Sequence, residues 1–189
     1  GNYHEAIEAF KKVVFIKPDH AKAYGNMGVA LHNQGRLDDA IDAYKKSVSL
    51  NPDYAETYSN MGNVFQAQGK LDEAIEAYKK SISLNPNFLE AYNNMGNTLR
   101  DQDKIEEAIN AYKKAISINP NYADAYSNIG IALKDQGKLD ESINAFNRAV
   151  TLNPNHAQAY SNMGNAFQDQ GNSKTWISWS LIIFSKFYF

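Results

Sequence analysis

Residues 55–88, AETYSNMGNVFQAQGKLDEAIEAYKKSISLNPNF, recur with small changes along most of this 189-residue chain. The prolines mark the period, because each stands 34 residues after the one before it: Pro18, Pro52, Pro86, Pro120 and Pro154. A fixed period of this length is typical of a structure built from stacked copies of one unit. The fold therefore follows from the structure of one unit and its packing on its neighbours.

Each half of the unit carries the apolar spacing of a helix, i, i+3, i+4 and i+7. The first half contributes Tyr58, Met61, Gly62 and Phe65, and the second half contributes Leu71, Ala74, Ile75, Tyr78 and Ile82. Gly69 lies between the halves as a helix stop, and Pro86 ends the second half because the residue before a proline avoids helical geometry. The unit is predicted to be an antiparallel helix pair.

The spacing of Tyr58, Met61, Gly62, Phe65, Ala74, Tyr78 and Pro86 resembles the tetratricopeptide repeat, over residues 1 to about 171. This resemblance implies an all-α fold, a right-handed superhelical solenoid of stacked antiparallel helix pairs whose first helices line a concave groove. Two residues depart from the pattern. Ser142 replaces the small Ala of the second helix, which predicts slightly looser packing, and Asp103 replaces the turn Gly, which predicts a strained turn. Asp53 with Glu56, and Asn87 with Glu90, predict capping boxes at the starts of first helices.

The period divides the chain into partial and complete repeats. These are 1–20 (the second helix of an incomplete first repeat), 21–54, 55–88, 89–122, 123–156, 157–171 (the first helix of an incomplete last repeat) and an atypical apolar tail, 172–189. Incomplete ends expose apolar faces, so we expect head-to-tail self-association, which light scattering at high concentration would detect. The tail is too short to cross a bilayer comfortably. A lid over the last helix is the preferred interpretation, ahead of a self-association segment and a membrane anchor.

One asparagine occupies the same place in five successive first helices: Asn26, Asn60, Asn94, Asn128 and Asn162. Asn is a mediocre helix former, so helix formation gives little reason to repeat it. An amide side chain carries a donor and an acceptor, which together match the C=O and N–H of an extended peptide backbone. The column predicts binding of extended peptides largely independent of their sequence. A second interpretation is that each amide bonds to the neighbouring helix.

A second asparagine column, one turn further along, is predicted to assist: Asn63, Asn97 and Asn165, with Val29 and Ile131 interrupting it. Side chains around the first column differ from repeat to repeat, which predicts that they set specificity. These predicted specificity residues are Glu56, Gln66, Glu90, Arg100, Asp124 and Lys134.

The asparagine column with its repeated NMGN motif resembles the peptide-recognition arm of O-linked N-acetylglucosamine transferase and of related bacterial repeat proteins. That resemblance implies asparagines that hold peptide main chain. It leaves two hypotheses: a binding scaffold without enzymatic activity, or the recognition arm of such a glycosyltransferase whose catalytic domain lies elsewhere. A clamp for a C-terminal carboxylate is disfavoured, because Gly25, Ser59, Asn93, Ser127 and Ser161 stand where that clamp has a lysine.

Composition narrows the classes of function. The chain has no Cys, no closely spaced His pair and no Gly-rich phosphate loop, so no catalytic, cofactor or metal site is predicted. A net charge of -2 offers no positive field for nucleic acid or an anionic membrane. No secretory signal is visible, so the cytoplasm is the default expectation. The predicted partner is a protein or peptide.

Overall fold

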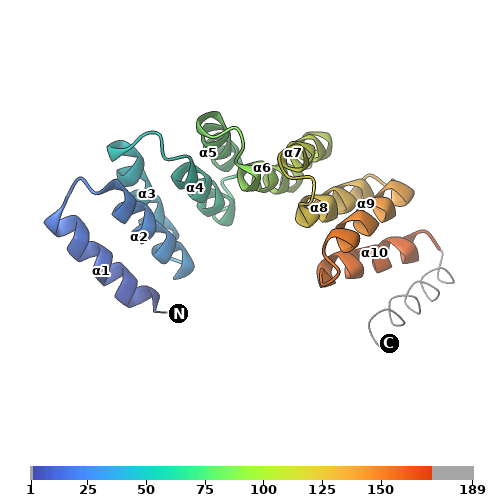
Figure 1. Ribbon diagram of the computed structural model, residues 1–189, viewed down its shortest axis with the longest axis horizontal. Helices are drawn as coiled ribbons and strands as arrows, with labels where there is room; N and C mark the ends of the chain where they lie inside the picture. Colours follow the sequence, from blue (N-terminus) through green and yellow to red (C-terminus); the bar gives the residue numbers. More distant parts are fainter. Residues whose placement is uncertain (1, 172–189) are drawn as a thin grey trace. The chain divides into compact units, whose positions relative to one another are not determined.

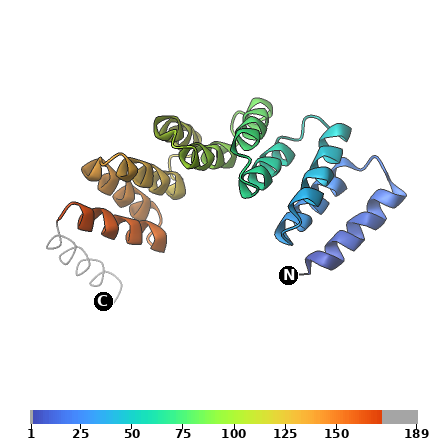
Figure 2. The ribbon, with the colours of Figure 1, turned by 180° about the vertical axis from the view of Figure 1, so that it is seen from behind.

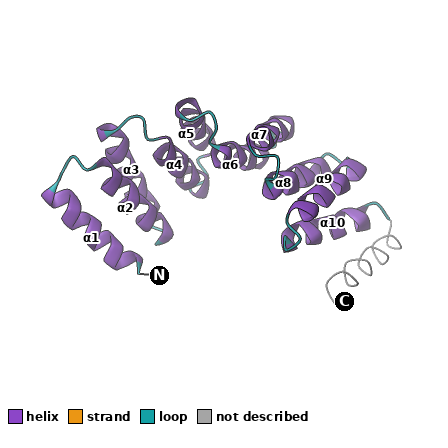
Figure 3. Cartoon of the chain, in the orientation of Figure 1, coloured by secondary structure: helices purple, strands orange, loops and turns teal. Residues whose placement is uncertain are grey.

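The computed structural model describes residues 2–171, and within them every regular element is an α-helix. The helices are α1 (Tyr3–Ile16), α2 (Ala21–Asn33), α3 (Leu37–Leu50), α4 (Ala55–Ala67), α5 (Leu71–Leu84), α6 (Leu89–Asp101), α7 (Ile105–Ile118), α8 (Ala123–Asp135), α9 (Leu139–Leu152) and α10 (Ala157–Asp169). Figures 1 and 3 show this succession of short helices and turns. The predicted all-α fold of stacked helix pairs is confirmed.

Two compact units make up the chain, Gly1–Asp103 and Lys104–Phe189. In the first unit the closest packing joins α2 to α3 and α4 to α5, and in the second it joins α8 to α9. Each pair also contacts the helix before or after it, and first helices touch across repeats: α2 with α4, α4 with α6, and α8 with α10. Figure 2 shows the same helices from behind. A layer of first helices is thereby formed within each unit.

A large aromatic ring of the second helix fills the space between the helices of a pair. Tyr44, Tyr78 and Phe146 are at most 1% exposed. Each ring lies directly against a first-helix glycine, where a Cβ atom would come within 2.5 or 2.6 Å of a ring carbon: Gly28, Gly62 and Gly130. The glycine is therefore needed to give the ring its space. The small Ala40, Ala74 and Ala108 on the second helices are fully buried as well.

The first helices α2, α4 and α8 end in the same two-bond turn. At the end of α2, Gly35 N donates to His32 O (2.8 Å) and Arg36 N donates to Leu31 O (3.0 Å). This is a Schellman ending, which requires the left-handed conformation at its central residue. Gly35 has a φ of 75°, and the corresponding Gly69 and Gly137 have 73° and 74°.

Asp103 occupies that left-handed position after α6, with a φ of 61°. It is the only residue other than glycine with a positive φ among residues 2–171. A Cβ in this region crowds the backbone, although Asp tolerates it better than most residues. The strained turn predicted from the sequence is confirmed.

Asp103→Gly is expected to raise the free energy of unfolding by about 1 kcal/mol, because glycine adopts this conformation without steric cost. Chemical denaturation followed by circular dichroism measures the change. Asp103→Ala is the matched control: it also removes the charge but keeps the Cβ, so it should not stabilise the protein. Stabilisation by both variants would mean that charge, rather than backbone conformation, is responsible.

The capping-box prediction is wrong. Helices α4 and α6 begin at Ala55 and Leu89, and their N-cap residues, Tyr54 and Phe88, make no side-chain cap hydrogen bond. Asp53 lies instead in the turn that follows Pro52, where its N–H donates to Asn51 Oδ1 (3.1 Å). The Asn before the proline caps this turn, and the same bond recurs at Asn85, Asn119 and Asn153, whereas Pro18 follows Lys17.

Ser142 fits the close helix pair without a loss of burial. Its side chain is fully buried, and Oγ donates to the backbone oxygen of Gly130 (2.7 Å). The additional hydroxyl is therefore hydrogen-bonded, and the predicted looser packing stays a prediction.

Candidate peptide-binding surface

Three of the five column asparagines lie in the first unit, on the neighbouring helices α2, α4 and α6. Asn26 and Asn60 line one pocket, and Asn60 and Asn94 line the next. The two pockets share Ala55, Glu56 and Asn60, so they adjoin. The structure therefore brings Asn26, Asn60 and Asn94 together along one hollowed face of the first unit.

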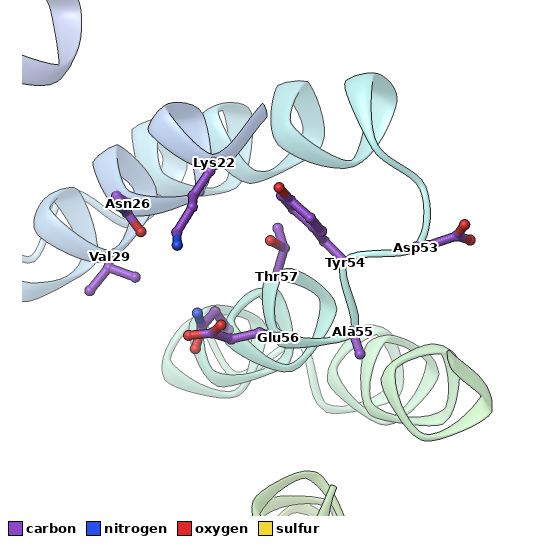
Figure 4. Close-up of a pocket in the computed structure, with 10 residues that line it drawn as sticks. Lys22, Asn26, Val29, Asp53, Tyr54, Ala55, Glu56 and Thr57 are labelled. Carbon is purple, nitrogen blue, oxygen red and sulfur yellow. The ribbon is translucent and has the colours of Figure 1, made fainter. Parts of the chain in front are cut away.

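The pocket between α2 and α4 has a volume of about 250 Å³. Its lining residues are Lys22, Gly25, Asn26, Val29, Asp53, Tyr54, Ala55, Glu56, Thr57 and Asn60. In Figure 4, the amine of Lys22 points into the space between the helices, the Glu56 side chain reaches in from α4, and Asp53 turns outward. This pocket thus offers one positive and one negative side chain beside its amides.

The pocket between α4 and α6 is larger, with a volume of about 510 Å³. Its lining residues are Ala55, Glu56, Ser59, Asn60, Asn63, Asn85, Phe88, Glu90 and Asn94. Four amide side chains and two carboxylates face this hollow, and no Lys or Arg lines it. Predicted main-chain binding residues and predicted specificity residues are thus found in one pocket.

Asn63 has an internal role that the sequence analysis missed. Its Oδ1 accepts hydrogen bonds from Tyr78 OH (2.8 Å) and from Asn94 Nδ2 (3.0 Å). Burial raises the pKa of Tyr78 far above its usual value, so the phenol stays protonated and acts as the donor. Asn63, one member of the second asparagine column, therefore links Tyr78 of the core to Asn94 of the first column.

Repeat 21–54 has another residue in place of that asparagine. Val29 occupies the place of Asn63, and the hydroxyl of the buried Tyr44 has no hydrogen-bond partner among the described residues. In the second unit Ile131 occupies this place, packed against the cluster that contains Phe146, which has no hydroxyl. A polar residue, Asn63, thus accompanies the ring that carries a hydroxyl, Tyr78, and an apolar residue, Ile131, accompanies the ring without one, Phe146. Val29 beside Tyr44 is the exception.

In the second unit, Asn128 and Asn162 lie on α8 and α10, which are in contact. Both side chains are partly exposed, and Asn162 Oδ1 accepts a hydrogen bond from Gln158 Nε2 (3.1 Å). Asn97 on α6 is partly exposed and Asn165 on α10 is exposed.

Two predicted specificity residues contact the next repeat, and two others lie close to a residue of their own repeat. Gln66 Nε2 donates to Asp101 Oδ2 (2.9 Å), and Lys134 Nζ lies 3.4 Å from Asp169 Oδ2. Asp124 Oδ1 lies 3.1 Å from His156 Nε2. Arg100 is within 3.9 Å of Asp101. Glu56 and Glu90 are exposed and make no hydrogen bond or ion pair with described residues.

Sequence reasoning missed a column of glutamines at the ends of the first helices. All but Gln34 donate through Nε2 to an acidic residue 30 positions earlier, in the preceding repeat. The pairs are Gln68 with Asp38, Gln102 with Asp72, and Gln136 with Glu106, each 2.8 Å apart, and Gln170 with Asp140, 2.5 Å apart. The hydrogen bond from Gln136 and the nearby Lys138 lower the pKa of Glu106. A search for polar pairs at this separation could have found the column.

Residues 2–171 show no sign of a metal site or of a membrane-spanning helix. No group of three or more His, Asp or Glu side chains is arranged to hold a metal ion there. No helix in this range combines the length and apolar character needed to cross a bilayer. The predicted lid, self-association or anchor role of the tail falls on 172–189, outside the described residues.

Family models of the tetratricopeptide repeat match this chain over residues 19–87 and 77–110, and a third, the TPR repeat model, matches residues 1–35, 96–137 and 132–171. The chain belongs to the tetratricopeptide repeat family. A search of curated proteins found no match.

Solved structures of other tetratricopeptide repeat proteins superimpose on the chain. A crystal structure of MamA is 32% identical and has a TM-score of 0.76, with 84% of this chain and 92% of MamA covered. YrrB, described as a TPR protein with an unusual peptide-binding site, is 24% identical, with a TM-score of 0.71 and 91% and 89% covered. PilF of Pseudomonas aeruginosa is 17% identical, with a TM-score of 0.82 and 99% and 85% covered. The last two likenesses bear on the fold alone.

Proposed function

We propose that this tetratricopeptide repeat protein is a non-enzymatic scaffold that binds extended peptide segments through its first asparagine column. The observation that supports the proposal is the placement of Asn26, Asn60 and Asn94 along two adjoining pockets of the first unit. Asn128 and Asn162 are proposed to act in the same way within the second unit. The description of YrrB as peptide-binding agrees with this class of function.

The geometry of neighbouring first helices suits an extended chain. Packed helices lie about 8 to 10 Å apart, and a strand advances about 3.3 Å per residue. Successive asparagines would therefore meet about every third residue of a bound peptide. Three of them in the first unit correspond to a segment of about seven residues.

The amide of Asn94 keeps capacity for a peptide despite its internal bond. One N–H of Asn94 donates to Asn63, which leaves a second N–H and the carbonyl oxygen. An amide side chain has two donor hydrogens and an acceptor oxygen. The internal bond fixes the orientation of the side chain, which lowers the entropy cost of binding. Asn94 thus bonds to the neighbouring helix through one N–H and keeps its other N–H and its carbonyl oxygen for the main chain of a peptide.

Asn60→Ala and Asn94→Ala are each expected to weaken peptide capture about fivefold, the equivalent of about 1 kcal/mol for a hydrogen bond. A pull-down of a randomised peptide library, followed by titration of captured peptides, measures the loss. Asn144→Ala, on the second helix α9 and outside the two pockets, is the control. Unchanged capture by the folded double variant Asn60→Ala/Asn94→Ala would refute the proposal.

The second hypothesis is the recognition arm of a glycosyltransferase similar to O-linked N-acetylglucosamine transferase. Its support is the asparagine column together with the repeated NMGN motif. Sequencing the gene on both sides of this region tests it. A catalytic glycosyltransferase domain in the same reading frame is the expected result, and flanking sequence without one would remove the hypothesis.

A further inference from the structure

The pocket between α4 and α6 has a one-sided charge. Glu56 and Glu90 both line it, both are exposed, and no Lys or Arg is among its lining residues. Two like charges without a counterion favour a cationic ligand, because the ligand lowers their mutual repulsion. In the pocket between α2 and α4, Lys22 stands where the other pocket has a second glutamate.

A serine in the same pocket points to a ligand as well. Ser59 lines the pocket, its residue is 3% exposed, and no hydrogen bond joins its side chain to a described residue. Its hydroxyl is not among the fully buried atoms that lack a partner, so it is open to the pocket. A hydroxyl is both a donor and an acceptor, so a polar group that enters the pocket can bond to it.

The remaining lining residues favour an organic cation over a metal ion. Phe88 lies at the pocket wall, and the face of an aromatic ring attracts an ammonium or guanidinium group. The amide oxygens of Asn60 and Asn85 are further acceptors for N–H donors. A pair of carboxylates is a poor metal site, and no set of three ligating side chains occurs among residues 2–171.

We propose that the pocket between α4 and α6 selects a basic residue, Lys or Arg, of the bound peptide. The proposal rests on the proposed peptide-binding function and specifies its ligand. The basic side chain lies between Glu56 and Glu90, beside Phe88, while Asn60 and Asn94 hold the main chain. The pocket between α2 and α4 does not share this preference, because Lys22 offsets Glu56 there.

The test is a pull-down with a pooled library of synthetic 12-residue peptides in which every position is randomised. With the unaltered chain, captured peptides should be enriched about fivefold in Lys and Arg over Asp and Glu at one position. Two carboxylates at an exposed site support an effect of this size. The enrichment should shrink as salt is raised, since exposed charges are screened.

Matched variants separate charge from main-chain binding. Glu56→Gln/Glu90→Gln should abolish the enrichment while total capture persists, and Glu56→Lys/Glu90→Lys should invert it toward Asp and Glu. Glu73→Gln, an exposed acidic residue on the second helix α5, is the control and should change nothing.

The outcomes distinguish the two levels of the proposal. Capture without any basic enrichment, or basic enrichment that survives in Glu56→Gln/Glu90→Gln, would overturn the pocket's selectivity and leave peptide binding intact. Failure of the unaltered chain to capture peptides at all would instead overturn the peptide-binding function.

Discussion

Gly28→Ala is expected to lower the free energy of unfolding by about 3 kcal/mol, at the upper end of overpacking costs. The new Cβ would lie 2.5 Å from Tyr44 Cε1 and 2.7 Å from Cδ1. Tyr44 is 1% exposed, so its ring cannot swing into solvent to make room. The helices must separate, and the packing between α2 and α3 is lost. Urea denaturation followed by circular dichroism measures the change.

Gly25→Ala, one turn earlier in the same helix, is the matched control. Its Cβ would lie 3.3 Å from Ser47 Oγ and 3.4 Å from Thr57 Oγ1, which is tight but permits small shifts. Alanine also improves helix propensity by up to about 1 kcal/mol. The stability of this variant should stay close to that of the unaltered chain. Equal losses for the two variants would show that contact with the ring is not the reason for glycine at residue 28.

Asn63→Val is expected to lower the free energy of unfolding by about 2 kcal/mol, because it removes the acceptor that lies 2.8 Å from the buried hydroxyl of Tyr78. Gln66 Oε1 is 3.5 Å from this hydroxyl, too far to replace a bond of 2.8 Å. Asn94 loses its acceptor as well. Thermal and urea denaturation both measure the loss.

A double-mutant cycle isolates the buried hydroxyl. Tyr78→Phe should partly rescue Asn63→Val, because the pair Val and Phe resembles Ile131 and Phe146, which the chain already contains. Coupling of about 1 to 2 kcal/mol is expected. Tyr44→Phe is the control and should cost almost nothing, since the Tyr44 hydroxyl has no partner to lose. Strictly additive effects of Asn63→Val and Tyr78→Phe would contradict the assigned bond.

Much of the fold could be predicted from the sequence, because its period and its apolar spacing are local properties. The turn at Asp103 is an example: one substitution in a repeated glycine position predicts a left-handed residue with a side chain, and φ is 61° there. The prediction of capping boxes was also wrong for a local reason. Asn51 captures the N–H of Asp53 in the turn after α3, so Asp53 never reaches the N-cap position.

The candidate site could be predicted only in part. Repetition identified the asparagine column, but it could not reveal that Asn63 accepts from Tyr78 and Asn94, since residues 15 and 31 positions apart meet only through helix packing. Nor could it reveal that Gln66 and Lys134, two of the predicted specificity residues, reach Asp101 and Asp169 in the next repeat.

The sequence by itself determined the repeat family, the helix pairs and their turns, because these depend on spacing and on backbone preferences within 34 residues. Only the tertiary structure decided which polar side chains are used internally and which face a pocket, because that depends on where stacked helices place them. Asn63 is held by two donors, while Glu56 and Glu90 share a pocket that contains no base. A carboxylate or amide has the same formula in every repeat, but its neighbours across the stack decide what it can bind.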